Sequence, residues 1–225
     1  MLYIYALLNR EPRENPGAGI LGEPLRVLAC GKLFAVVSAM NEAPPLVEAS
    51  LRGHEQTMRR LADGVDAILP ARFGSVLPDE QALAKLLESR EVELREALAL
   101  VEGREQMTLR VYGEETVPQE IEPAEYEGLG PGARYLSGKV RARERERLMT
   151  ELEAVRPALE ALIRAERIQR HSTPPLLASV YHLIDRGQSS RYIEVLGART
   201  SADLPVRLTA SGPWPPYAFA RAEWL

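Results

Sequence analysis

The apolar positions in the first forty residues fall into three short runs that are typical of strands. Residues 2–8 form an almost continuous apolar run with aromatic and β-branched members, as expected for a buried strand. Two further runs, 25–29 and 33–38, are separated only by Cys30-Gly31-Lys32, which suits the tight turn of a β-hairpin. Residues 9–24 hold three prolines and three glycines and therefore predict a loop.

Helical periodicity follows in two places. From residue 46 to 65 the apolar positions recur at alternating steps of four and three, which places them on one stripe of a helix. The members of this stripe are Val47, Leu51, His54, Met58, Leu61 and Val65. A second helix is predicted from an N-cap at Asp79 to about Glu102, with Gly103 ending it. Its predicted buried face consists of Leu83, Leu87, Leu94, Leu98 and Val101.

A change of composition divides the chain after the next predicted strand, residues 107–112. We predict an N-terminal α+β domain over residues 1–113, because strands and helices alternate there. Residues 114–131 contain six Glu, three prolines and no basic residue, so they predict an acidic linker. The remaining residues, 132–225, are assigned to a C-terminal α+β domain.

The C-terminal domain opens with a long helical pattern, from residue 134 to 170. Its apolar seam continues through Pro157, where we predict a kink, because an interior proline removes a backbone hydrogen bond. The pattern then predicts a strand over residues 176–184, a short helix or strand over 189–196, and a strand over 204–210. Proline-rich residues 212–217 are predicted to be irregular.

Composition and charge narrow the class of protein. The 225 residues are 45% hydrophobic and 27% charged, which excludes collagen-like and fully disordered chains. No apolar run approaches the roughly 18 residues of a membrane helix, so no membrane is predicted as a partner. Cys30 is the single cysteine, which excludes an internal disulfide and fits a reducing cytosol. The net charge of -4 is unevenly distributed, because the predicted linker is acidic and the C-terminal domain is basic.

No set of residues predicts a catalytic, metal or cofactor site. Residues 17–22 match G-x-G-x-x-G, but prolines separate them from the preceding strand and no helix follows directly. His54-Glu55 opens like a zinc-protease helix, yet Met58 stands where the second histidine should be, so His54 is interpreted as a hydrogen-bonded core residue. The basic run 141–147 contains two Glu and no aromatic residue, which favours a solvated helix face over a nucleic-acid site.

Two aromatic, proline-containing segments stand out instead. Residues 69–74 place Arg72 beside Phe73, behind a proline that fixes the backbone. Residues 212–219 concentrate Trp214, Tyr217 and Phe219 around Pro216. Such a segment either fills the core or forms a rigid docking ridge, and composition alone favours filling the core.

These two segments also carry a family resemblance. Together with weaker matches elsewhere, they show that the chain resembles the GvpL/GvpF family of gas vesicle accessory proteins over most of its length. The chain departs from the family pattern in the small Ala71 and in a compact second half. The matching pieces are Tyr3-Ile4-Tyr5, Gly19-Ile20, Gly22, 33–38, His54-Glu55, 69–76, Tyr135-Leu136 and 212–219.

The resemblance implies a cytoplasmic protein without enzymatic activity that helps to assemble the gas vesicle. It implies two α+β domains, at least one ferredoxin-like, with mostly antiparallel sheets. The partners it implies are the very apolar shell protein and other accessory proteins. As partner-binding residues we expect Arg72, Phe73, Trp214, Pro216, Tyr217 and Phe219. The alternative is a small-molecule-binding regulatory module, because ferredoxin-like domains often hold ligands at their sheets.

Overall fold

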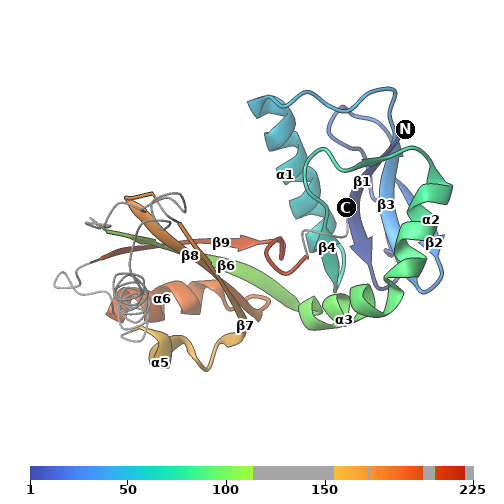
Figure 1. The fold of residues 1–225 in the computed structure, drawn as a ribbon. Coiled ribbons are helices and arrows are strands. Elements are labelled where there is room, and N and C mark those ends of the chain that lie inside the picture. Colours follow the sequence, from blue (N-terminus) through green and yellow to red (C-terminus); the bar gives the residue numbers. More distant parts are fainter. Residues whose placement is uncertain (114–154, 172, 200–205, 221–225) are drawn as a thin grey trace, which may run out of the picture.

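The computed structural model describes residues 1–113, 155–171, 173–199 and 206–220. Within these residues the chain forms two antiparallel sheets, each with helices packed against it (Figure 1). The predicted α+β class with two small antiparallel-sheet parts is confirmed. A ferredoxin-like arrangement in either part stays a prediction.

The first sheet is built around β1 (Leu2–Leu8), whose seven residues are all buried. On one side β1 pairs with β3 (Leu33–Ala39), and on the other with β4 (Ile68–Pro70) and β5 (Val76–Leu77). The edge strand β2 (Arg26–Cys30) pairs with β3 and forms the predicted hairpin. The turn between them needs Gly31, whose φ of 62° lies in the left-handed region that favours glycine.

Helices cover both faces of the first sheet. Figure 1 shows α1 (Glu48–Asp63) on one face, with α2 (Glu80–Ser89) and α3 (Glu91–Val101) on the other. Tyr3 and Tyr5 of β1 belong to the core under α1, whereas Ile4 and Leu7 belong to the core under α2 and α3. Because β1 is buried on both faces, its sequence lacks the polar alternation of a half-exposed strand.

The buried face of α1 differs in part from the predicted stripe. His54, Met58 and Leu61 are buried as predicted, but Val47 and Leu51 are 49% and 43% exposed. The buried face is centred on Ser50, His54, Thr57 and Leu61, so Val47 and Leu51 lie on a flank of the helix. The prediction that these two side chains enter the core was therefore wrong.

The second predicted helix is divided into α2 and α3. Asp79 is the N-cap as predicted, and its side-chain oxygen accepts a hydrogen bond of 2.8 Å from the Ala82 N–H. Arg90 leaves helical geometry at φ −129°, ψ 15°, and the chain bends there. The predicted apolar face is buried on both sides of the bend, because both helices pack on the same sheet.

The second sheet has the strand order β7-β8-β6-β9. At its centre, β8 (Leu176–Asp185) and β6 (Arg104–Tyr112) pair along their whole length. The edges are β7 (Ile163–Arg170), which pairs with β8, and β9 (Arg207–Trp214), which pairs with β6. The strand predicted over 107–112 was counted with residues 1–113, but it is hydrogen-bonded into this second sheet.

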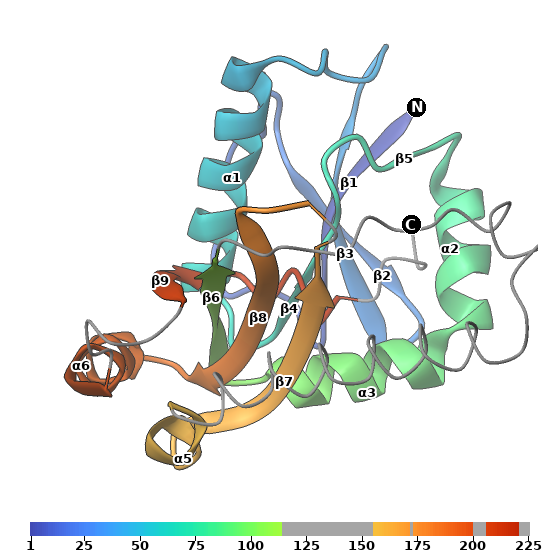
Figure 2. The same ribbon diagram turned by 60° about the vertical axis from the view of Figure 1, so that its left-hand side comes forward.

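One face of the second sheet is covered by α5 (Arg156–Leu159) and α6 (Ser189–Arg199), as Figure 2 shows. Tyr192 and Leu196 of α6 pack on Met107, Leu109 and Val180 of the sheet. The short helix or strand predicted over 189–196 is thus a helix. The other face of this sheet turns away from α5 and α6.

Two predictions for the second half were wrong. Residues 163–170 form β7 and not the end of a long helix. Their polar residues fit the period of a helix as well as that of a strand, and cross-strand pairing with β8 decides between the two. Pro157 lies in the first turn of α5, where its missing N–H costs no hydrogen bond, so no kink in a continuous helix is seen there. Residues 134–154 of the predicted helix lie outside the described residues.

The last strand also runs further than predicted. Residues 212–214 were expected to be irregular, yet β9 continues to Trp214. Pro213 is tolerated because β9 is an edge strand and its pairing with β6 has an irregularity between Gln106 and Thr108.

The predicted division of the chain is only partly visible. The linker 114–131 lies outside the described residues, so the boundaries 1–113, 114–131 and 132–225 stay predictions. In the part of the chain that the structure describes, no helix combines the length and the hydropathy needed to cross a membrane.

Candidate functional site

The segment that follows β9 crosses from the second sheet to the first. Phe219 is 1% exposed and belongs to a core cluster that contains Leu183 of β8 and Leu98 of α3. Pro215 and Pro216 are buried as well. The structure therefore uses Pro216 and Phe219, two of the predicted partner-binding residues, to fill the core between the two sheets.

Hydrogen bonds fix this crossing segment to the second sheet. The Ala218 N–H donates to the buried side-chain oxygen of Gln106 at 2.8 Å. The Ala218 carbonyl accepts a bond of 2.6 Å from Arg167, whose guanidinium carbon lies 5.4 Å from the centroid of the Phe219 ring. Since backbone and side chain are both held, the aromatic residues next to Ala218 have a fixed orientation.

Trp214 and Tyr217 contact α1. The guanidinium carbon of Arg59 lies 4.4 Å from the centroid of the half-buried Trp214 ring. Tyr217 packs against the core under α1, and burial, assisted by the nearby Glu55 carboxylate, raises the pKa of its phenol. Tyr217 is therefore a neutral phenol at pH 7 that closes the end of this core.

Residues 71–74 contact the same helix through the Phe73 ring. The Phe73 ring meets the His54 ring edge-on, with centroids 5.7 Å apart and an interplanar angle of 88°. Gly74 has a φ of 85°, and its N–H donates to the Tyr3 hydroxyl at 3.1 Å. Arg72 is exposed, and its guanidinium has no hydrogen-bond or ion-pair partner among the described residues.

His54 links the loop at residues 71–74 to β1, because its two ring nitrogens contact Ala71 and Tyr3. Its Nε2 lies 3.3 Å from the Ala71 carbonyl and its Nδ1 lies 3.1 Å from the Tyr3 hydroxyl. Because a carbonyl only accepts, the proton must be on Nε2, and the Tyr3 hydroxyl donates to Nδ1. Burial lowers the pKa of His54 and raises that of Tyr3 to about 12. The predicted hydrogen-bonded core histidine is confirmed.

The two motif segments therefore meet along one helix. Residues 47, 51, 55 and 59 follow one another at steps of four, so they form a single ridge on α1. This ridge begins with the exposed Val47 and Leu51 and ends with Arg59, on which Trp214 rests, while Phe73 contacts the adjacent His54. We call Val47, Leu51, Arg72, Phe73 and Trp214 the junction surface.

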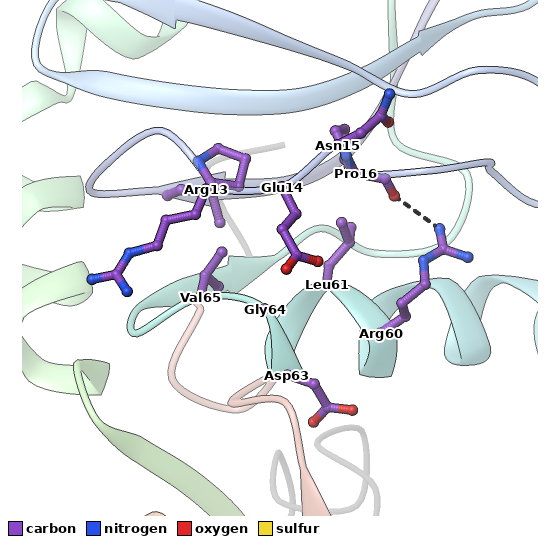
Figure 3. Close-up of a pocket in the computed structure, with 11 residues that line it drawn as sticks. Arg13, Glu14, Asn15, Pro16, Arg60, Leu61, Asp63, Gly64 and Val65 are labelled. Carbon is purple, nitrogen blue, oxygen red and sulfur yellow. Dashed lines mark hydrogen bonds between the residues drawn. The ribbon is translucent and has the colours of Figure 1, made fainter.

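The glycine-rich loop borders a separate cavity. Arg60 of α1 donates to the carbonyls of Pro16, at 3.1 Å, and Ala18, which ties the loop to the helix. A cavity of about 510 Å³ lies between residues 12–16 and the end of α1. Figure 3 shows Glu14 pointing into it, whereas Asp63 points away. Residues 17–22 lie in a loop, as expected from the prolines on either side of them, and they do not form the strand-loop-helix arrangement of a dinucleotide site.

One buried network was missed in the sequence. His182 of β8 contacts the Tyr192 hydroxyl through Nδ1, at 2.6 Å, and the Glu166 carboxylate through Nε2, at 2.9 Å. The other oxygen of Glu166 accepts a bond of 2.7 Å from Arg156. The hydrogen bond from His182 lowers the pKa of Glu166, and burial raises that of Tyr192.

This network fastens β7, β8, α5 and α6 to one another. Both ring nitrogens of His182 are occupied and the ring is 3% exposed, so a substrate has no access to it. Glu166 and His182 are direct cross-strand neighbours, but finding them requires that residues 163–170 be recognised as a strand. Among the described residues, no group of three or more His, Cys, Asp or Glu is placed to hold a metal ion.

The chain is similar to known proteins over nearly its whole length. Residues 1–221 match the family model described as gas vesicle synthesis protein GvpL/GvpF. Gas vesicle protein L of Streptomyces sp. (strain CB03234) is 32% identical, with 97% of this chain and 92% of the relative aligned. Gas vesicle protein F of the same strain is 25% identical, with 96% and 98% aligned.

Solved structures agree with the fold. The crystal structure of gas vesicle protein GvpF from Microcystis aeruginosa matches with a TM-score of 0.75 and 19% identity, over 98% of both chains. The crystal structure of GvpF from Anabaena sp. PCC7120 also gives a TM-score of 0.75, with 17% identity over 98% of this chain and 95% of the other.

Proposed function

The chain belongs to the GvpL/GvpF family and takes part in gas vesicle formation, and we propose that it does so by binding the apolar shell protein through the junction surface. The binding is a contact function that needs no bond-making chemistry. The encounter takes place in the cytoplasm, before the shell protein polymerises, and other accessory proteins are further candidate partners.

The physical need for such a partner follows from the nature of a gas-filled shell. A wall that excludes water must present an apolar inner face, so its free subunits expose large apolar patches and tend to aggregate. A soluble protein that buries about 800 Å² of such a patch would suffice for specific holding. Exposed aliphatic and aromatic side chains on a rigid frame are suited to this task.

The observation that carries the proposal is the meeting of the two motif segments on α1. Phe73 and Trp214 are far apart in the sequence, yet both are half-buried and contact neighbouring turns of one helix. Val47 and Leu51 extend the same helix as exposed aliphatic residues. Aromatic anchors next to aliphatic side chains are the usual composition of energetically dominant contacts.

The absence of enzymatic activity is part of the proposal. His54 and His182 are the buried histidines of the described residues, and the ring nitrogens of both are occupied by hydrogen bonds within the protein. This favours a structural role for both over general acid–base catalysis.

The proposal is tested by capture of the purified shell protein on immobilised wild type and variants. Leu51→Ser and Trp214→Ala should each weaken capture about tenfold, since one interface anchor commonly contributes more than 1 kcal/mol. Val92→Ser is the matched control, because Val92 is an exposed aliphatic residue on α3, away from α1. Equal capture by wild type and both variants, all with the same melting temperature, would reject the junction surface.

The cavity beside Glu14 favours a second candidate, a small-molecule-binding regulatory module. Its volume of about 510 Å³ lies within the usual range for ligand pockets, and it combines Glu14 with the apolar Leu61 and Val65. A metabolite that raises the melting temperature of wild type, but not of Glu14→Ala, would support this candidate. No effect from shell protein in the same assay would then exclude the first.

A further inference from the structure

The second sheet carries a polar row on the face that turns away from α5 and α6. On β6 the apolar Met107, Leu109 and Val111 pack toward the helices, so Thr108 and Arg110 point to the opposite face. Arg110 is paired with Thr209 of β9 and with Ser179 of β8, and Ser179 is paired with Gln169 of β7. Directly paired residues share a face, so Thr209, Arg110, Ser179 and Gln169 form one row across four strands. We call these four residues the arginine row.

The charge of Arg110 is not neutralised by the described residues. It is exposed, and no hydrogen bond or ion pair joins its guanidinium to another described residue. Two nearby arginines are paired with carboxylates: Arg164 of β7 with Asp185 at 2.5 Å, and Arg156 of α5 with Glu166 at 2.7 Å. Arg110 lies in the middle of a sheet face and has no such carboxylate partner among the described residues.

The surroundings of Arg110 are donors and positive charge. On the side toward the junction, Thr108 is paired with Ser211 and Tyr181. Thr108 is buried and the Tyr181 hydroxyl donates to Gln169, so the half-buried Ser211 is the hydroxyl that this pairing adds to the surface. On the other side lies Arg207, exposed and with its guanidinium carbon 4.7 Å from the centroid of the Tyr112 ring. The strand segments 108–112, 167–171, 177–181 and 207–211 contain no Asp or Glu, so these described strand segments place no carboxylate on this half of the face.

We infer that the arginine row binds a segment rich in Asp and Glu from a partner protein. The exposed Arg110 guanidinium provides charge-assisted donors that carboxylates accept, and the exposed Thr209 and Gln169 add a hydroxyl and an amide. Ser179 lies between Arg110 and Gln169 but is buried, and its hydroxyl lies 2.9 Å from Nε2 of His171. Four strands spaced about 4.8 Å apart give a row of about 14 Å, which corresponds to about four residues of extended peptide. The row lies on the second sheet, so this inference goes beyond the proposed function of the junction surface.

An acidic peptide fits this face better than a nucleic acid does. Sheets that bind single-stranded nucleic acid stack bases on free aromatic rings. Here the Tyr112 ring is covered by Arg207, and Tyr181 packs against the core while its hydroxyl donates to Gln169 at 2.9 Å. No aromatic face of these two residues remains open for a base.

The test uses the full chain and a fluorescently labelled octaglutamate peptide, with octaglutamine as the neutral control. Anisotropy should show that wild type binds octaglutamate, that added salt weakens binding, and that octaglutamine does not bind. Arg110→Gln should weaken binding about tenfold, the loss expected for one charge-assisted contact. Arg170→Gln is the matched control, because Arg170 is exposed on β7 but is paired with Ala178, which points to the helix-covered face.

Three results would overturn the inference, provided that both variants melt at the wild-type temperature. The first is no binding of octaglutamate to wild type at about 1 mM, a concentration that detects interactions as weak as about −4 kcal/mol. The second is an equal loss for Arg110→Gln and Arg170→Gln, which would indicate unspecific attraction. The third is tighter binding of a single-stranded RNA octamer that is lost with Arg110→Gln, which would make this face a nucleic-acid surface.

Discussion

Arg59 of α1 rests on the ring of Trp214 at the end of β9, with its guanidinium carbon 4.4 Å from the ring centroid. The contact joins a helix of the first sheet to a strand of the second. Five residues further along the chain, the buried Phe219 packs in a core cluster that contains residues of both sheets. Cation–π contacts of this kind contribute about 0.5–1 kcal/mol at exposed sites.

Loss of this contact should weaken the junction slightly. We expect Arg59→Ala to lower the free energy of unfolding by about 0.5–1 kcal/mol, measured by urea denaturation. Arg52→Ala is the control, since Arg52 is on the same helix and, like Arg59, pairs with a glutamate four residues before it. Equal losses in the two variants would show that the ion pairs, and not the Trp214 ring, account for the effect.

Truncation of a side chain in the core between the sheets should lower the free energy of unfolding far more than loss of the Arg59 contact. Phe219→Ala removes a fully buried aromatic ring from a cluster shared by both sheets, and such changes cost about 3–5 kcal/mol. We expect a large fall in melting temperature and a transition that depends on the probe, because the two sheets lose their common core. A variant that melts like wild type would contradict the assignment of Phe219 to a shared core.

His54 should make stability depend on pH. Its folded pKa is lowered by burial, so below the unfolded value of about 6.5 the unfolded chain binds the proton more readily. The free energy of unfolding should therefore be largest above pH 6.5 and fall as the pH drops toward the folded pKa. Denaturation midpoints measured between pH 7.5 and pH 5 give the slope of stability against pH. The fall in stability should begin at about pH 6.5.

The matched pair for this experiment is His54→Gln and His171→Gln. His54→Gln should flatten the slope, because the titrating group is removed, whatever its effect on absolute stability. His171 is half-buried, and its Nε2 lies 2.9 Å from the Ser179 hydroxyl of β8. A slope that changes with His171→Gln and not with His54→Gln would contradict the assignment.

Much of the first sheet could be predicted from the sequence, because its hydrophobic patterns fit only one type of secondary structure. The run at β1, the hairpin around Gly31 and the Asp79 cap depend on neighbours in sequence, and all three were found. Val47 and Leu51 were misplaced, because periodicity identifies an apolar stripe but not how much of it the sheet covers.

The second sheet was harder to predict because distant pairing decides its structure. Ile163–Arg170 has polar residues that fit a helix or an edge strand, and only β8 settles the choice. The meeting of Phe73 and Trp214 on α1, like the contact between Glu166 and His182, depends on the position of elements that are far apart in sequence. Spacing identified the aromatic segments but could not decide which of their residues fill the core.

The network around His182 should stabilise the second sheet at neutral pH. Tyr192→Phe leaves Nδ1 of a buried histidine without its hydroxyl partner, and an unsatisfied buried polar atom costs about 1–3 kcal/mol.

Glu166→Gln removes the carboxylate whose pKa is lowered chiefly by the hydrogen bond from His182. That stabilisation is present above the unfolded glutamate pKa of about 4.3 and is lost as the pH falls through the folded pKa. Wild type and Glu166→Gln should thus differ in urea midpoint at pH 7 and converge toward pH 3, while Glu194→Gln, on the exposed side of α6, should follow wild type throughout. A constant difference between wild type and Glu166→Gln across this range would mean that packing, and not the charge of Glu166, holds β7 to β8.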